Sequence, residues 1–203
     1  MRRYALKETL QRGSFGTVCR AVSETTGETV AIKKISKSLP NARTVFYNEI
    51  DIHGLLNHPN IIKLHHTWED ASNFYIVLDY ASRGDLYDHF KKNGVCTEAE
   101  ARIFLCGIAK ALIHCHKQRI VHGDVKVDNV LVGDDGEPLL CDFGCARVLH
   151  DNLFPNGQGT TINWAPEMFG ERVTINEKID VWGLGVIAYE LLTGHMPFDA
   201  GGT

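Results

Sequence analysis

The 203-residue sequence lacks several features that would place it in a specialised class of protein. No apolar run is long enough to span a bilayer, and the start, Met1-Arg2-Arg3-Tyr4, lacks the apolar stretch of a secretory signal. Repeats and low-complexity segments are absent. With 21 basic and 25 acidic residues, the chain also lacks the positive excess that nucleic-acid and anionic-membrane surfaces select. We therefore expect no nucleic-acid partner and no membrane partner.

The cysteines lack an organising pattern as well. None belongs to a Cys-x-x-Cys motif or has the spacing of zinc ligands; they are Cys19, Cys96, Cys106, Cys115, Cys141 and Cys145. Scattered cysteines of this kind are typical of reduced thiols, so we expect an intracellular protein, cytoplasmic or nuclear. His114, Cys115, His116 and His122 lie close in sequence and could suggest a metal site. On a helix the first three point in different directions, which favours ordinary core and helix-end residues.

The sequence pattern changes along the chain, from strand-like in the first eighty residues to mainly helical after them. Short runs rich in β-branched and aromatic residues predict strands over Tyr4–Leu10, Thr17–Ser23, Thr29–Ile35, Ile61–Glu69 and Phe74–Tyr80. Helical spacing predicts one helix among them, Ala42–Asn57, and three later ones, Leu86–Lys92, Glu98–Lys117 and Ile179–Leu192. Two short strands, Val130–Val132 and Pro138–Cys141, bracket a turn. We predict an α+β fold: a small antiparallel β lobe with one helix and a larger, mainly helical lobe.

The β lobe carries two motifs suited to a nucleotide. Gly13 and Gly16 lie on the turn between the first two strands, where phosphates can approach a backbone that lacks side chains. A plain glycine hairpin is the alternative for this turn. Lys33 ends the apolar run Val30-Ala31-Ile32 and therefore needs a buried anion, either a nucleotide phosphate or Glu49 on the following helix.

The helical lobe carries the residues for phosphoryl transfer. That reaction needs a carboxylate to orient the attacking hydroxyl, a cation on the transferred group and oxygen ligands for Mg²⁺. Two motifs supply these groups. His122-Gly123-Asp124 and the residues after it provide Asp124, Lys126 and Asn129, and Asp142-Phe143-Gly144 provides Asp142. Any single aspartate here could instead cap a turn.

Taken in order, and joined by Ala165-Pro166-Glu167 and the motif from Asp180 to Trp182, these signals resemble the eukaryotic protein kinase family over essentially the whole chain. The resemblance implies one bilobal kinase domain, residues 1–203, with a β lobe (1–78), a hinge (79–84) and a helical lobe (85–203). It implies ATP and Mg²⁺ as cofactors and protein substrates with Ser or Thr. The catalytic roles it implies are phosphate binding by Lys33 paired with Glu49, orientation of the hydroxyl by Asp124, stabilisation of the transferred group by Lys126, and magnesium binding by Asn129 and Asp142.

The resemblance also implies the residues that hold ATP, each of which has core packing as an alternative role. They are Gly13, Ser14, Phe15, Gly16, Val18, Ala31, Lys33, Leu78, Asp79, Ala81, Asp85 and Leu131. Lys126 two residues after Asp124, with Gly159-Thr160 ahead of Ala165, is typical of the Ser/Thr branch. Within that branch the chain loosely resembles Aurora- and Polo-like kinases.

Three departures from the family change what we expect of regulation. Gly123 stands where regulated kinases have a phosphate-binding arginine, and no Ser, Thr or Tyr occurs from Phe143 to Gly159. We therefore expect activity that does not depend on phosphorylation in this stretch. His53 stands where the family has an apolar residue, so an activating or stabilising protein partner could be needed; alternatively, the histidine packs and finds a hydrogen bond.

The chain is also shorter at its C-terminal end than the family. The alternative function is a pseudokinase, a scaffold that binds nucleotide or partner proteins without efficient transfer.

Overall fold

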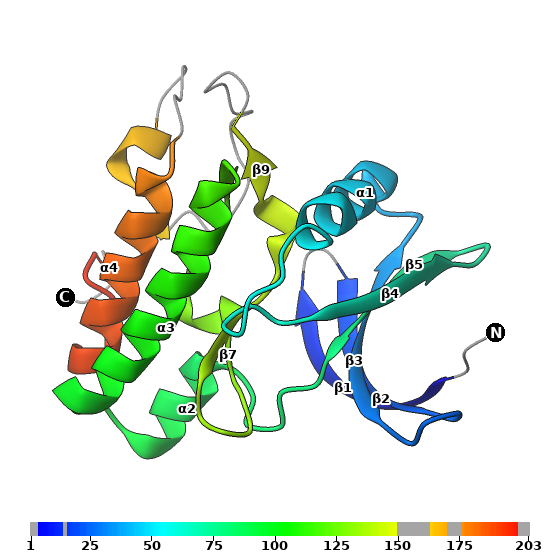
Figure 1. Ribbon diagram of the computed structural model, residues 1–203, viewed down its shortest axis with the longest axis horizontal. Helices are drawn as coiled ribbons and strands as arrows, with labels where there is room; N and C mark the ends of the chain where they lie inside the picture. Colours follow the sequence, from blue (N-terminus) through cyan, green and yellow to red (C-terminus); the bar gives the residue numbers. More distant parts are fainter. Residues whose placement is uncertain (1–3, 14–15, 150–162, 170–175, 199–203) are drawn as a thin grey trace. The chain divides into compact units, whose positions relative to one another are not determined.

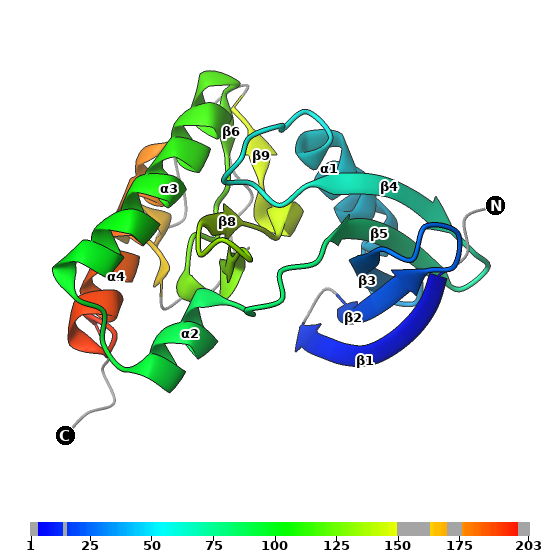
Figure 2. The ribbon, with the colours of Figure 1, turned by 60° about the horizontal axis from the view of Figure 1, so that its bottom comes forward.

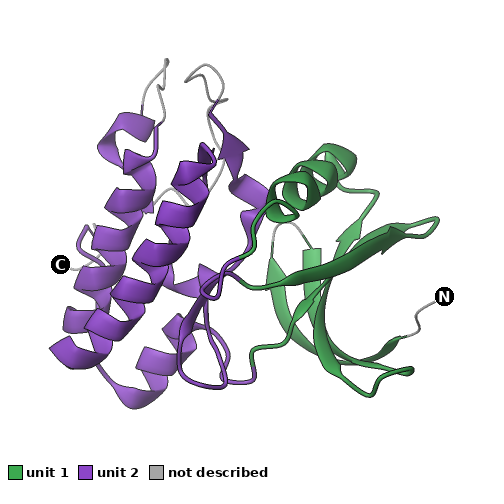
Figure 3. Ribbon diagram, viewed as in Figure 1, with its two compact units in different colours: residues 1–57, 62–81 green, residues 58–61, 82–203 purple. Residues whose placement is uncertain are grey.

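The computed structural model describes residues 4–13, 16–149, 163–169 and 176–198 (Figure 1). Contacts divide the chain into two compact units, residues 1–57 with 62–81 and residues 58–61 with 82–203 (Figure 3). The short segment 58–61 belongs to the second unit through Asn60. Its side-chain Nδ2 donates to the Pro138 carbonyl at 3.0 Å, and its own carbonyl accepts from the Leu140 amide at 2.9 Å.

The first unit is built on a five-stranded antiparallel sheet. Its strands are β1 (Tyr4–Gly13), β2 (Gly16–Ser23), β3 (Thr29–Ser36), β4 (Leu64–Glu69) and β5 (Asn73–Asp79), in the order β1-β2-β3-β5-β4. The sheet is strongly curved (Figure 2). Tyr4 of β1 stacks on Trp68 of β4, with ring centroids 5.8 Å apart, so the first and last strands of the order meet through their aromatic side chains.

Helix α1 (Ala42–His53) packs on this sheet through Phe46, whose ring stacks on Phe74 of β5 at 4.5 Å. The sequence predicted a helix to Asn57, which is wrong by four residues. After Gly54 the amides of Leu55 and Leu56 bond three residues back, and the helix is not continued. The strand predicted from Ile61 likewise begins only at Leu64, because Ile61 pairs with Leu140 of the second unit.

The second unit contains three helices in the part of the chain that the structure describes. Helix α2 (Leu86–Asn93) is capped at its N-terminus by Asp85, whose carboxylate accepts from the Asp88 amide at 2.8 Å. Helix α3 (Glu98–Lys117) starts with a capping box formed by Thr97 and Glu100. Helix α4 (Lys178–Thr193) ends at Gly194, and it lies beside α3 in both ribbon views (Figures 1 and 2).

Short paired strands hold the loops of the second unit in place. β7 (Val130–Val132) pairs with β8 (Pro138–Leu140), as the sequence predicted, and β6 (Ile120–Val121) pairs with β9 (Arg147–Val148). Single helical turns lie between them and after them: η1 (Val127–Asn129), η2 (Phe143–Cys145) and η4 (Pro166–Met168). Across the described ranges, no helix combines the length and the apolar character that crossing a membrane requires.

Candidate active site

A buried ion pair occupies the centre of the first unit. Nζ of Lys33, on β3, lies 2.7 and 2.8 Å from the two carboxylate oxygens of Glu49, on α1. Lys33 is 5% exposed and Glu49 only 1%. Removing one partner of such a pair leaves an unpaired buried charge, at a cost of about 3–5 kcal/mol. The predicted anion for Lys33 is therefore present within the protein itself.

His53 fixes the end of the helix that carries Glu49. The ring is buried, and Nε2 lies 2.7 Å from the Ile62 carbonyl oxygen, to which it donates. This agrees with the alternative in which the histidine packs and finds a hydrogen bond. The need for an activating partner stays a prediction.

The glycine turn joins β1 to β2. Gly13 and Gly16 face each other at the end of the ladder, and Gly16 has φ +144°. A side chain at Gly16 would collide with the Lys34 carbonyl oxygen, so this position requires glycine for a close approach of two backbones. Ser14 and Phe15, also predicted to bind ATP, lie outside the described residues.

The other predicted nucleotide residues of the first unit lie on the strands beside Lys33, except Ala81, which follows β5. Val18 is opposite Lys33 across β2 and β3, and Ala31 is opposite Leu78 across β3 and β5. The Asp79 amide donates to the Lys63 carbonyl at 3.0 Å. Val18, Leu78, Asp79 and Ala81 are partly exposed, whereas Ala31 is buried.

In the second unit, Asp85 and Leu131 are brought together by a bridge between their backbones. The cap on α2 already uses one carboxylate oxygen of Asp85, a role that sequence reasoning had not assigned to it. Burial raises the pKa of Asp85, and the nearby carboxylates of Asp88 and Asp128 raise it further. Leu131 stays partly exposed on β7.

Three of the predicted catalytic residues meet around one carboxylate. Oδ2 of Asp124 accepts from Nδ2 of Asn129 at 3.0 Å and lies 3.0 Å from Nζ of Lys126. The Asn129 side chain also donates to the Asp124 backbone carbonyl at 2.8 Å. The turn η1 makes this possible, because it folds residues 127–129 back toward Asp124. A carboxylate held by an amide and an ammonium group has a defined position.

Asp142 lies next to this group along the backbone. The Cys141 amide donates to the Asn129 carbonyl at 2.9 Å, which places the residue before Asp142 against Asn129. Asp142 has φ +58°, a left-handed conformation, and its carboxylate accepts from the Gly144 amide at 3.2 Å. The next residue, Phe143, is fully buried and packs edge-on against the His122 ring at 4.9 Å.

Asp180, the third residue of α4, holds the start of the loop that carries Asp124. Its carboxylate accepts from the backbone amides of His122 and Gly123, both at 2.9 Å, and from Nε2 of His116 at 2.8 Å. Asp180 is 1% exposed. Sequence reasoning used Asp180 only as part of a motif and missed this role. An acidic residue at the start of a mainly apolar helix was the available signal.

Gly123 has a conformational reason to be glycine. Its φ is +77°, and a Cβ atom would lie 3.0 Å from the Cys145 carbonyl oxygen. The left-handed region is open to glycine without steric penalty. Position 123 therefore has two separate properties: it lacks the arginine side chain that binds a phosphate, and its backbone conformation favours glycine.

The histidines that could have suggested a metal have separate partners. His116 bonds Asp180, Nε2 of His122 donates to the Cys141 carbonyl at 2.9 Å, and a ring nitrogen of His114 lies 3.0 Å from Nε2 of Gln118. The described residues contain no group of three or more side chains that could hold a metal through His, Cys, Asp or Glu. All six cysteines are free thiols, and burial raises the pKa of both Cys115 and Cys145 to about 12.

Comparison with known proteins gives consistent matches. The family model "Protein kinase domain" matches residues 4–203. NUAK family SNF1-like kinase 2 of Homo sapiens is 38% identical over 201 residues, which are 97% of this chain and 32% of that protein. Sucrose non-fermenting protein kinase 1 of Fusarium virguliforme and serine/threonine-protein kinase SIK2 of Gallus gallus are each 36% identical, over 97% of this chain and 28% and 25% of those proteins.

The chain thus spans about a third of the length of these curated relatives, or less. The relatives support the Ser/Thr branch of the kinases. They do not support the looser resemblance to Aurora- and Polo-like kinases, because the similar proteins are SNF1-related.

Proposed function

Because this chain belongs to the protein kinase family, we propose that it transfers the γ-phosphoryl group of Mg-ATP to serine or threonine hydroxyls of protein substrates. The observation that carries the proposal is the arrangement at Asp124. One carboxylate oxygen is held by Asn129 and Lys126, at 3.0 Å each. Such an arrangement suits a residue that orients a hydroxyl for attack and accepts its proton.

The residues of each unit fit the parts that phosphoryl transfer requires. Lys33 is buried and paired with Glu49, and its positive charge would also stabilise a second anion, a nucleotide phosphate. Asn129 and Asp142 offer an amide oxygen and a carboxylate, and one or two such oxygen ligands together with phosphates are what Mg²⁺ prefers. When bound, Mg-ATP supplies the phosphoryl group and the metal charge that neutralises it. Lys126 would then balance the negative charge on the transferred group, while Asp124 positions the substrate hydroxyl.

We further propose that phosphorylation between Phe143 and Gly159 does not control this activity. Gly123 has no side chain that could bind a phosphate, and that stretch contains no hydroxyl-bearing residue. Treatment of the active protein with a broad phosphatase should leave the rate unchanged. A loss of activity would contradict the proposal unless it is traced to Thr160 or Thr161, which lie outside the described residues.

Transfer of radiolabelled phosphate from ATP to a generic Ser/Thr substrate, with and without Mg²⁺, tests the main proposal. Asp142→Ala should abolish transfer, whereas Asp134→Asn, which changes an exposed carboxylate outside the loop, should leave it unchanged. Acid hydrolysis of the product should give phosphoserine or phosphothreonine. Nucleotide binding by calorimetry with no transfer above the Asp142→Ala level would instead support the pseudokinase alternative.

A further inference from the structure

Two histidine rings meet where residues 58–61 of the second unit contact helix α3. These residues form a turn, closed by a hydrogen bond from the Ile61 amide to the His58 carbonyl at 3.0 Å. The ring centroids of His58 and His114, on α3, are 5.2 Å apart, with the ring planes at 36°. Both residues are partly buried. Neither is among the residues predicted for ATP, magnesium or phosphoryl transfer, so the pair is a separate feature of the chain.

The His58 ring stabilises its own turn through a nitrogen that must be unprotonated. The Asn60 amide donates to Nδ1 of His58 at 3.1 Å. A backbone N–H can only donate, so Nδ1 has to offer its lone pair, and the ring proton is on Nε2. In the imidazolium form both ring nitrogens carry protons. Protonation of His58 would therefore break this hydrogen bond and leave two N–H groups facing each other.

The electrostatic surroundings of His58 also oppose a proton. Burial lowers the pKa of the His58 ring below its ordinary value of 6.5, and the charges of His114 and Lys110 lower it further. Both groups come from α3, where Lys110 lies one turn before His114 on the same face. The next two residues of the turn, Pro59 and Asn60, carry no charge. A proton on His58 would thus lie beside basic groups.

The turn that His58 stabilises is bonded to β8 of the same unit. The Asn60 side chain donates to the Pro138 carbonyl at 3.0 Å, and the Asn60 carbonyl accepts from the Leu140 amide at 2.9 Å. β8 also contacts α3 and lies beside it in Figure 2. Asp142 follows only two residues after Leu140. Opening of the turn would therefore remove hydrogen bonds from the strand that leads to Asp142.

We propose that His58 and His114 form a proton-sensitive switch that controls the turn 58–61. At neutral pH His58 accepts from Asn60, and the turn stays bonded to β8. As pH falls below about 6.5, a proton on His58 breaks this bond and is repelled by Lys110, so the turn opens. The folded chain holds this proton less tightly than the unfolded chain, so stability is complete above the ordinary histidine pKa and falls as pH drops below it. The switch does not depend on phosphoryl transfer.

Hydrogen exchange of the Leu140 amide, which donates to the turn, measures this opening. Protection is compared at about pH 7.5 and about pH 5.5, which bracket the histidine range, after correction for the intrinsic exchange rate. In the parent chain it should be about 2- to 10-fold lower at the acid pH, the range for one lost neutral hydrogen bond. In His58→Asn it should change by less than about twofold, because the asparagine side-chain oxygen can accept from the same amide and does not titrate. Equal losses in the two chains, or no loss in the parent, would overturn the switch.

Two further variants keep the test decisive if His58→Asn does not fold. His195→Asn removes an exposed histidine elsewhere in the second unit and should retain the full loss of protection at acid pH. His114→Gln keeps His58 and its bond to Asn60 but removes the neighbouring ring and its charge, so the loss should be smaller than in the parent chain. A loss in His114→Gln equal to that of the parent would refute the part assigned to His114.

An NMR titration of the histidine rings tests the switch directly. The His58 signal, assigned by its absence in His58→Asn, should titrate with a pKa below the ordinary 6.5 in the parent chain and closer to that value in His114→Gln. A pKa of His58 at or above 6.5 in the parent chain would refute the switch. If the parent chain transfers no phosphate, the proposed function fails, while exchange and titration still decide whether the switch is present.

Discussion

Replacing Asp180 with asparagine should destabilise the second unit and the loop that carries Asp124. The Asp180 carboxylate accepts three hydrogen bonds at 2.8–2.9 Å, two through Oδ2 and one, from Gly123, through Oδ1. An asparagine has one carbonyl oxygen, so its amide group must face at least one of these donors. Loss of the charge weakens the bonds that remain. With two bonds effectively lost, at about 1.5–3 kcal/mol for each charge-assisted bond, the free energy of unfolding should fall by about 3–6 kcal/mol.

Thermal unfolding followed by circular dichroism measures this change. At about 2–4 °C per kcal/mol for a domain of this size, Tm should fall by roughly 6–24 °C. His116→Ala removes only one of the three donors and should produce a smaller fall, which keeps the test informative if Asp180→Asn does not fold. A Tm for Asp180→Asn within 2 °C of the parent chain would refute the assignment of Asp180 as the residue that holds the loop.

Three further predictions concern single positions. Glu49→Gln should reduce stability by about 3–5 kcal/mol, measured by urea unfolding, because Lys33 would remain buried without its partner charge; a change below 1 kcal/mol would contradict a buried pair. Gly123→Ala should cost about 1–2 kcal/mol in the same assay, because φ is +77° there, and an unchanged midpoint would argue against that backbone conformation. Burial, helped by the Asp128 carboxylate, raises the pKa of Glu190, so the unfolded chain releases this proton at lower pH than the folded one. Stability should therefore fall as pH rises from the ordinary glutamate pKa through the raised one, and Glu190→Gln should flatten this part of a Tm-against-pH curve; identical curves would count against the shift.

Local sequence patterns were enough to predict most elements of the fold. Helix α3 begins and ends at the predicted residues, because Thr97 and Glu100 form a cap that sequence alone reveals and the apolar spacing is regular. The extent of α1 was overestimated, since its apolar spacing continues beyond Gly54 although the helix does not. The two-residue strands β6 and β9 could not be predicted, because so short a pair has no periodicity and forms only when distant segments meet.

The candidate site shows the same division. Motif spacing was sufficient to nominate Lys33, Asp124 and Asn129, since the chemistry of phosphoryl transfer demands these residue types. The function of Asp180 was not readable, because its three donors come from segments about 60 residues away. The cap that Asp85 makes for α2 was readable in principle but had been assigned only to a nucleotide.

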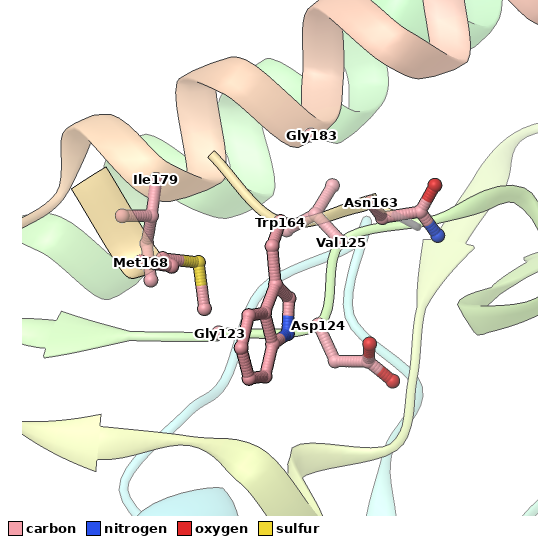
Figure 4. A pocket seen from close by; sticks show the side chains of 8 residues that line it. All are labelled: Gly123, Asp124, Val125, Asn163, Trp164, Met168, Ile179 and Gly183. Atoms are coloured by element: carbon pink, nitrogen blue, oxygen red, sulfur yellow. The ribbon is translucent and has the colours of Figure 1, made fainter. Parts of the chain in front are cut away.

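By itself, the sequence determined the family, the order of helices and strands, and the residue types available for chemistry, because periodicity, caps and short motifs are local properties of the chain. Only the tertiary structure decided how those residues are held. In the folded chain Lys33 and Glu49 form a buried ion pair. The Asp124 carboxylate contacts Asn129 and Lys126. Trp164 lines a cavity together with Gly123 (Figure 4). Burial and hydrogen-bond geometry arise from segments distant in sequence, and no local pattern specifies them.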